Sequence, residues 1–307
     1  MIDDKSSAVL LMAYGGPDSL DDIPAYLADI RGGRPTPQHF LDEITERYRL
    51  IGGKSPLKDI TQSAAAKLEN AIDLPVYVGM RHWHPYIKDV ILQMLTDGID
   101  HIIAICMAPH YSTMSIEAYK KQLTKALAPS GDAITVDFVD SWHTQPDYLQ
   151  GVMDNVQSTL SKWPAEQQPN VKVIFTAHSL PERIRQQNDP YEAQLHETAA
   201  LIAQRLGLSE QQWLFCFQSA AQTGEPWLGP QIETVIAELA DKAEQNMLVA
   251  PIGFIADHVE VLYDIDIAVQ RIAQAKQVRV ERTPMLNDSE ALVNALTSLA
   301  QEYLHTA

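Results

Sequence analysis

The sequence has few cysteines, a deficit of positive charge and no long apolar run. Its 307 residues include only two cysteines, Cys106 and Cys216, whereas an iron–sulfur cluster is usually held by four cysteine thiolates. Both cysteines lie in apolar, strand-like runs, where a small buried thiol in a reducing compartment is the simpler interpretation. The sequence therefore predicts a protein without an iron–sulfur cluster.

The charge and the apolar runs exclude further classes of protein. The formal net charge of −17 opposes binding to nucleic acid and to anionic lipid. The apolar runs fall short of the roughly 20 residues that cross a bilayer, and the acidic start at residues 1–5 is unlike a basic secretory leader. No glycine-rich phosphate loop with its lysine supports nucleotide use. We expect a cytoplasmic protein with no integral membrane segment.

Short apolar runs alternate with longer amphipathic stretches. Such alternation predicts an α/β fold of parallel sheets covered by helices, with binding sites at the carboxyl ends of the strands. The predicted strands are Val9–Ala13, Val76–Gly79, Ile102–Met107, Ile134–Val139, Val171–Ala177, Trp213–Phe217 and Met247–Ala250. The predicted helices include Ala64–Ala71, Tyr86–Leu95, Tyr148–Leu160, Glu192–Arg205, Ile232–Ala243 and Ser289–Leu304.

A polar stretch with two prolines, Ser161–Asn170, separates the first four predicted strands from the later ones and is typical of a linker. We therefore predict an N-terminal α/β domain over residues 1–163, a second α/β domain over residues 164–286 and a C-terminal helical segment over residues 287–307. No internal repeat is strong enough to be identified from the sequence.

A histidine and a glutamate are the main candidates for chemistry. His178 directly follows a predicted strand, with Ser179 as the expected cap of the next helix. Glu260 lies in a predicted helix over 257–269, on one face with Asp257 and Asp264. An imidazole and a carboxylate suit divalent iron, and so few protein ligands leave coordination positions open. A structural histidine and a solvated acidic face are the alternative interpretations.

Five strings stand out in the sequence: Met12–Gly15, Ile51–Pro56, Thr176–Pro181, Pro226–Pro230 and Phe254–Asp264. They resemble motifs of the ferrochelatases, which insert ferrous iron into a porphyrin to make haem. The resemblance runs in order from about residue 8 to residue 290 and is closest to the soluble form of Gram-positive bacteria, which acts on coproporphyrin III. It implies two doubly wound, Rossmann-like parallel-sheet domains around a porphyrin cleft, with the C-terminal helix packing back on the first domain.

The resemblance also implies roles for individual residues. His178 and Glu260 would handle the metal or accept the pyrrole protons, and Tyr14 would ligate iron of the product from the opposite face of the ring. His82 and Asp264 would support this centre, whereas Ala268 stands where related chains often carry a carboxylate, which argues against an outer metal site. The residues that would bind the porphyrin are Tyr14, Arg31, Arg47, Tyr48, Ser55 and Tyr119.

The expected activity is insertion of Fe²⁺, as a substrate, into coproporphyrin III to give coprohaem III, with no permanently bound cofactor. The chain lacks a long apolar lip insertion before the Gly52 segment, and Arg31 and Arg47 at the rim of an open cleft suit four propionates. We expect a monomer that interacts transiently with another enzyme of the haem pathway. A protoporphyrin IX ferrochelatase, a sirohydrochlorin cobaltochelatase and a non-catalytic haem or porphyrin carrier are the alternatives.

Overall fold

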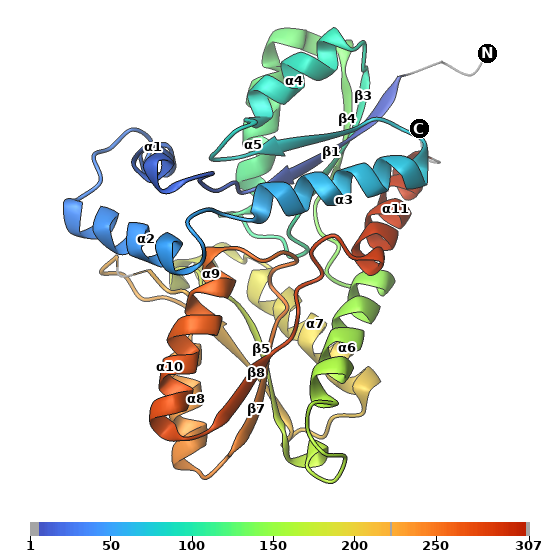
Figure 1. Ribbon diagram of the computed structural model, residues 1–307. Helices are drawn as coiled ribbons and strands as arrows, with labels where there is room; N and C mark the ends of the chain where they lie inside the picture. Colours follow the sequence, from blue (N-terminus) through green and yellow to red (C-terminus); the bar gives the residue numbers. More distant parts are fainter. Residues whose placement is uncertain (1–5, 222, 305–307) are drawn as a thin grey trace. The chain divides into compact units, whose positions relative to one another are not determined.

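The computed structural model describes residues 6–221 and 223–304. Within them, the chain forms two compact units, each built on a four-stranded parallel sheet (Figure 1). Unit 1 comprises residues 6–109, 113–142 and 287–304, and unit 2 comprises residues 110–112 and 143–286 apart from residue 222. The predicted class, α/β with two doubly wound parallel sheets, is confirmed.

The sheet of unit 1 has the order β2-β1-β3-β4. The central strands β1 and β3 are almost completely buried because helices cover both faces, which is why they read as continuous apolar runs. The strands are β1 (Ser7–Ala13), β2 (Val76–Met80), β3 (His101–Cys106) and β4 (Thr135–Val139). The helices are α1 (Ile23–Ile30), α2 (Gln38–Leu50), α3 (Leu57–Ile72), α4 (Ile87–Thr96), α5 (Ile116–Leu127) and α11 (Glu290–Leu304).

Helix α11 belongs to unit 1, although it lies at the far end of the described chain. It packs against α3, and a polar cluster joins the two segments. The carboxylate of Asp288 accepts hydrogen bonds from Ser63 Oγ at 2.6 Å and from Lys67 Nζ at 2.6 Å. The amphipathic pattern of the helix, with Leu292 and Leu296 fully buried, provides the apolar part of this contact.

Unit 2 repeats the same sheet order as β6-β5-β7-β8. Its strands are β5 (Lys172–His178), β6 (Trp213–Gln218), β7 (Asn246–Pro251) and β8 (Arg279–Arg282). Its helices are α6 (Pro146–Leu160), α7 (Tyr191–Leu206), α8 (Ile232–Asp241), α9 (Val259–Leu262), a π-helix (Asp264–Val269) and α10 (Gln270–Lys276). Short 3₁₀ helices lie in unit 1 at Leu20–Asp22 and Ala128–Ala133, and in unit 2 at Gln168–Asn170 and Glu182–Gln187.

The boundary between the units differs from the predicted one at 163/164. Helix α6 packs with α7 and β7 of unit 2, and the Tyr148 hydroxyl donates to the Ile252 carbonyl at 2.6 Å. The buried Trp163 indole also donates to the Asn246 side chain of this unit at 2.9 Å. A helix preceding β5 therefore covers the second sheet, and the polar stretch 161–170 is a loop inside unit 2. The predicted limits at 1 and 307 lie outside the described residues.

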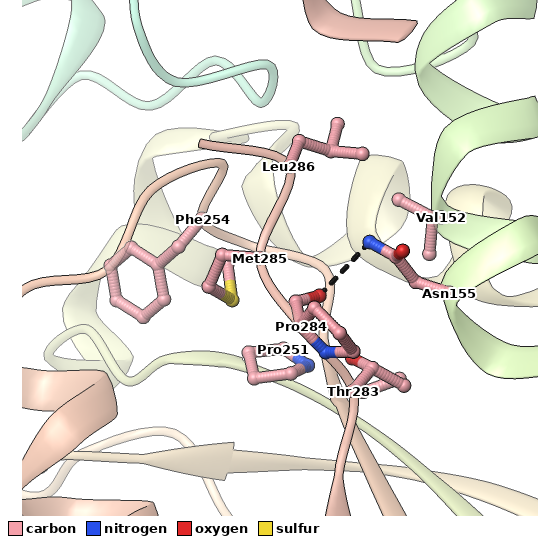
Figure 2. A pocket seen from close by; sticks show the side chains of 9 residues that line it. Val152, Asn155, Pro251, Phe254, Thr283, Pro284, Met285 and Leu286 are labelled. Carbon is pink, nitrogen blue, oxygen red and sulfur yellow. Dashed lines mark hydrogen bonds between the residues drawn. The ribbon is translucent and has the colours of Figure 1, made fainter. Parts of the chain in front are cut away.

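The segment that follows β8 is held by α6. Asn155 donates from its side-chain amide to the Pro284 carbonyl at 3.0 Å, and Figure 2 shows this bond at the edge of a small pocket. Phe254, Met285 and Leu286 provide apolar lining. In the described part of the chain, no helix is both long enough and apolar enough to cross a membrane.

Candidate active site

His178 is the last residue of β5, so its side chain stands at the carboxyl edge of the second sheet. Its backbone is fixed by pairing with Gln218 of β6 and by the Tyr191 hydroxyl, which donates to the His178 carbonyl at 3.0 Å. Gly253 passes directly beside the end of the strand, where an added Cβ would lie 2.5 Å from the Cβ of Ala177. A glycine is therefore required at this crossing.

Glu260 reaches His178 from α9. Glu260 Oε2 lies 3.1 Å from His178 Nδ1 and 3.8 Å from His258 Nε2. The approach to Nδ1 is an ion-pair distance without good hydrogen-bond alignment. Phe254 packs beside both histidines, with ring centroids 6.4 Å from His178 and 4.3 Å from His258. The structure therefore brings the two main candidates from the sequence, His178 and Glu260, into contact.

His178 and Glu260 shift each other's pKa values. Burial favours the neutral imidazole, but Glu260, with a smaller contribution from Asp264, outweighs burial and raises the pKa of His178 above its ordinary value. Burial would raise the pKa of Glu260, but His178 and then His258 outweigh it and hold that pKa well below its usual range. Below the raised pKa of His178, the pair is an imidazolium beside a carboxylate, and an entering cation has to displace that proton.

The predicted row of three carboxylates on one continuous helix is present only in part, because Asp257 lies outside it. The predicted helix over 257–269 is wrong in this respect: Asp257 precedes α9, and a π-helix begins at Asp264. The Ala268 amide donates to the Tyr263 carbonyl five residues earlier, at 2.9 Å, which changes the register of the side chains. Asp264 is buried and accepts a hydrogen bond from the Ser219 hydroxyl.

Sequence reasoning missed the residues that hold this helix. Gln218, at the end of β6, donates to the Glu260 carbonyl at 2.8 Å and accepts from the Thr176 hydroxyl at 2.7 Å. The next residue, Ser219, bonds Asp264 from a left-handed conformation with φ 61°. The sequence feature that could have identified them is the polar pair Gln218–Ser219 at the end of an otherwise apolar strand. The predicted cap Ser179 instead donates to the Leu228 carbonyl at 2.7 Å, and Pro181 precedes the 3₁₀ helix.

No cluster of three or more His, Cys, Asp or Glu side chains suited to a metal occurs among the described residues. His178 and Glu260 are two neighbouring donor groups of unit 2 that could hold a metal ion together. Nitrogen and carboxylate donors fit divalent iron, and a short ligand set suits a metal that arrives as a substrate and leaves in the product.

Unit 1 presents aromatic and cationic groups at the carboxyl edge of its own sheet. Tyr14 directly follows β1 and is 40% exposed. Its ring lies 4.7 Å from that of His82, and the Arg81 guanidinium lies 5.9 Å from its centroid and 5.4 Å from that of Tyr119. His82 is fixed by a 2.8 Å bond between its Nδ1 and Asp29. Arg81 is not among the residues predicted to bind the porphyrin, although it contacts two of them.

The other predicted porphyrin-binding residues have different surroundings. Tyr48, Ser55 and Tyr119 are buried, and burial raises the pKa of Tyr119 well above its ordinary value. A Cβ added to Gly16 would lie 2.5 Å from Ser55 Oγ and 3.7 Å from the Tyr48 hydroxyl. Both hydroxyl groups therefore lie beside Gly16, two residues after Tyr14 in the chain.

The two predicted arginines lie at the surface of the α1–α2 region. Arg31 is partly exposed after α1 and donates to the Pro35 carbonyl at 3.3 Å. Arg47 on α2 pairs with Glu43 at 2.7 Å. The structure brings Tyr14, His82 and Tyr119 together around Arg81, with Tyr48 and Ser55 beside Gly16.

Solved structures show which fold class this architecture belongs to. The chain superposes on SirB from Bacillus subtilis with a TM-score of 0.63 at 14% identity, over 97% of this chain and 95% of that one. It superposes on CbiX, described as the terminal enzyme of sirohaem biosynthesis in denitrifying bacteria, with a TM-score of 0.55 at 12% identity, over 96% of this chain and 98% of that one. At such identities the likeness defines the fold, which is that of the chelatases.

Sequence comparison gives the family within that class. The ferrochelatase family model matches residues 6–304. A ferrochelatase of Deinococcus radiodurans is 44% identical over 97% of this chain and 96% of its own length. Coproporphyrin III ferrochelatases of Geobacillus kaustophilus and Bacillus subtilis are 38% and 36% identical, over 96% and 98% of this chain and 95% and 98% of their own lengths. The chain belongs to the ferrochelatase family and is a porphyrin metallochelatase.

Proposed function

We propose that this ferrochelatase inserts Fe²⁺ into coproporphyrin III, giving coprohaem III and releasing two protons. The supporting observation is a concentration of arginine in a chain of net charge −17. Residues 31–49 carry four arginines, Arg31, Arg34, Arg47 and Arg49, in the region between β1 and α3. Guanidinium groups bind carboxylates through paired hydrogen bonds, and coproporphyrin III carries four propionates where protoporphyrin IX carries two.

In the proposed reaction, unit 1 supplies the groups that bind the porphyrin. Arg31 and Arg47 bind propionates, with Arg47 exchanging Glu43 for the substrate, and Tyr48, Ser55 and Tyr119 contribute hydroxyl groups. Tyr14 ligates the iron of the product. The exposed Tyr14 ring and the cationic Arg81 beside it are consistent with an anionic, flat ligand.

Unit 2 supplies the metal and proton chemistry. Each insertion replaces two pyrrole protons with Fe²⁺, so the site has to accept protons as well as donate ligands to a cation. The two groups divide these tasks: the raised pKa of His178 makes its neutral imidazole the stronger proton acceptor, and the lowered pKa of Glu260 keeps its carboxylate ionised for a cation. The reaction uses no resident cofactor and no iron–sulfur cluster, which metal analysis of the purified protein tests.

The test is anaerobic insertion of Fe²⁺, followed by loss of porphyrin fluorescence, with coproporphyrin III and protoporphyrin IX side by side. We expect a higher kcat/KM for coproporphyrin III than for protoporphyrin IX, and we expect the difference to arise from a lower KM. A higher kcat/KM for protoporphyrin IX would overturn the substrate assignment and leave the enzyme class intact. Sirohydrochlorin with Co²⁺ is the control for a cobaltochelatase, and binding of either porphyrin without insertion would indicate a carrier.

A further inference from the structure

Arg282 is the last residue of β8, and its side chain is only 14% exposed. Its guanidinium forms a paired contact with Asp266, from Nε to Oδ1 at 2.6 Å and from Nη2 to Oδ2 at 2.8 Å. The same Nη2 lies 3.3 Å from Asp257 Oδ1. One cation therefore contacts two carboxylates that are nine positions apart in the sequence.

These two carboxylates enclose the segment that carries Glu260. Asp257 lies in the loop just before α9, and Asp266 lies in the π-helix just after it. Gln218 holds the middle of the segment through the Glu260 carbonyl. Arg282 thus fixes the segment on both sides of Glu260, and the bond from Gln218 fixes it between them.

The arginine is itself held on a rigid support. Its backbone pairs with Val249 of β7, and its Nη1 donates to the Thr283 carbonyl at 3.0 Å. The segment after it is fixed by the bond from Asn155 to the Pro284 carbonyl (Figure 2). The second sheet and α6 therefore determine where the guanidinium lies, and the guanidinium transmits that position to the segment with Glu260.

The contact remains charged in spite of burial. Burial disfavours the guanidinium cation, but Asp266 and Asp257 outweigh it and raise the pKa of Arg282. Removing the cation would leave two carboxylates uncompensated in the segment that bears Glu260, and breaking a buried pair on one side only is strongly unfavourable. The segment would then shift or take up water.

We propose that Arg282 is a positioning residue for metal insertion, which sets the place of the Glu260 carboxylate relative to His178 through Asp266 and Asp257. This inference rests on the proposed roles of His178 and Glu260. A two-ligand metal set has no further protein donor to compensate for a displaced carboxylate, and residues that orient metal ligands typically affect metal affinity or activity about 10- to 100-fold when removed.

The test compares Arg282→Gln, Arg282→Lys, Asp266→Asn and the double variant Arg282→Gln/Asp266→Asn in anaerobic insertion. We expect KM for Fe²⁺ to rise about 10- to 100-fold in Arg282→Gln, with unchanged porphyrin affinity measured by fluorescence quenching. Arg282→Lys restores the charge without the planar fork and should recover part of the loss. The double variant should lose less than the product of the two single losses, because both remove the same contact.

Arg279→Gln is the matched control, because Arg279 lies on the same strand and pairs with Glu281 at 3.0 Å without a measured contact to residues 257–269. It should keep the wild-type KM for Fe²⁺. Thermal unfolding of every variant identifies those that are folded at the assay temperature. If Arg282→Gln does not fold, KM for Fe²⁺ in the isosteric Asp266→Asn variant is the deciding measurement.

A folded Arg282→Gln or, failing that, a folded Asp266→Asn with the wild-type KM for Fe²⁺ would overturn the inference. So would strictly multiplicative losses in the double variant, or an equal rise in KM for Fe²⁺ in Arg279→Gln. Failure of the proposed function has a different signature: the wild-type protein would insert no iron into coproporphyrin III, or a folded Glu260→Gln variant would insert it at the normal rate.

Discussion

The two units use one sheet design for two kinds of chemistry. In both, the first strand of the unit lies between the second and third, in the orders β2-β1-β3-β4 and β6-β5-β7-β8. In both, a proline carbonyl beyond the second strand accepts a backbone bond from it, Met80 to Pro85 at 2.7 Å and Phe217 to Pro230 at 2.8 Å.

The first strand of each unit leads into the residue of greatest interest. Strand β1 ends at Ala13 and is followed by Tyr14, whereas β5 contains Ala177 and ends at His178. Unit 1 surrounds its phenol with Arg81 and His82, while unit 2 surrounds its imidazole with carboxylates. The shared scaffold thus fixes where a side chain emerges, and the residues at the strand ends decide whether the edge suits an anionic ring or a cation.

The largest expected effect is on Glu260. Glu260→Gln removes the carboxylate that contacts His178, so we expect insertion to fall about 100- to 10,000-fold, the range typical of a general acid–base group. Porphyrin affinity should stay unchanged, since the proposed porphyrin-binding groups belong to unit 1. Anaerobic insertion and fluorescence quenching measure the two quantities. Glu238→Gln on α8 is the control, and an equal loss of porphyrin binding would break the division of roles.

The opposite pattern is expected for the arginines of unit 1. Arg31→Ala and Arg47→Ala should each raise KM for coproporphyrin III about 10- to 100-fold, since a hydrogen bond to a charged group contributes roughly 1.5–3 kcal/mol. KM for Fe²⁺ should not change. Steady-state kinetics with each substrate varied in turn tests this, with the exposed Arg271→Ala of α10 as the control. A rise in KM for iron alone would contradict the assignment.

Glycines beside the two strand edges allow a comparison of packing. Gly253→Ala places a Cβ 2.9 Å from the Ala177 Cα, while Gly16→Ala meets the side chain of Ser55 at 2.5 Å. We expect each to lower the free energy of unfolding by about 1–3 kcal/mol. Ala177→Gly should rescue Gly253→Ala only in part, because the backbone contact remains. Urea unfolding measures these changes, and a Gly253→Ala protein as stable as wild type would show that the crossing can widen.

The smallest expected effect is a shift in titration. The Glu260→Gln substitution removes the main negative charge that opposes the effect of burial on His178. The pKa of His178 should therefore fall relative to wild type. Histidine NMR, with His178→Asn for assignment, measures it. In the wild-type protein, the stabilisation by this ion pair is lost as pH rises through the raised pKa of His178. It is also lost as pH falls through the lowered pKa of Glu260. An unchanged His178 titration in the variant would contradict this coupling.

The sequence predicted the fold class because the buried central strands are short apolar runs that alternate with amphipathic helices, a pattern typical of parallel sheets. It did not predict β8, whose residues 279–282 alternate polar and apolar at a sheet edge. Helix α2 buries only Tyr48 and so has a weak apolar pattern, and α1 and α5 are also absent from the predicted set.

The candidate site was predictable as residue types and less so as contacts. His178 and Glu260 could be named from local strings, and the structure places them together. The π-helix could not be predicted, because its register depends on tertiary contacts such as the bond from Ser219 to Asp264. Asp257 fits a helical pattern in the sequence, but it contacts Arg282, 25 positions later. Long-range pairs of this kind carry no local signal.

The division of the chain has a consequence for synthesis. Nearly all of unit 2 comes from the continuous run 143–286, whereas unit 1 needs residues 287–304 to supply α11 against α3. On the ribosome, the segments of unit 2 therefore emerge complete before unit 1 has its last helix. Until then α3 lacks that cover and Lys67 lacks Asp288. Unit 1, which begins first, is therefore completed last. Chaperones that bind exposed apolar surface would encounter unit 1 without α11.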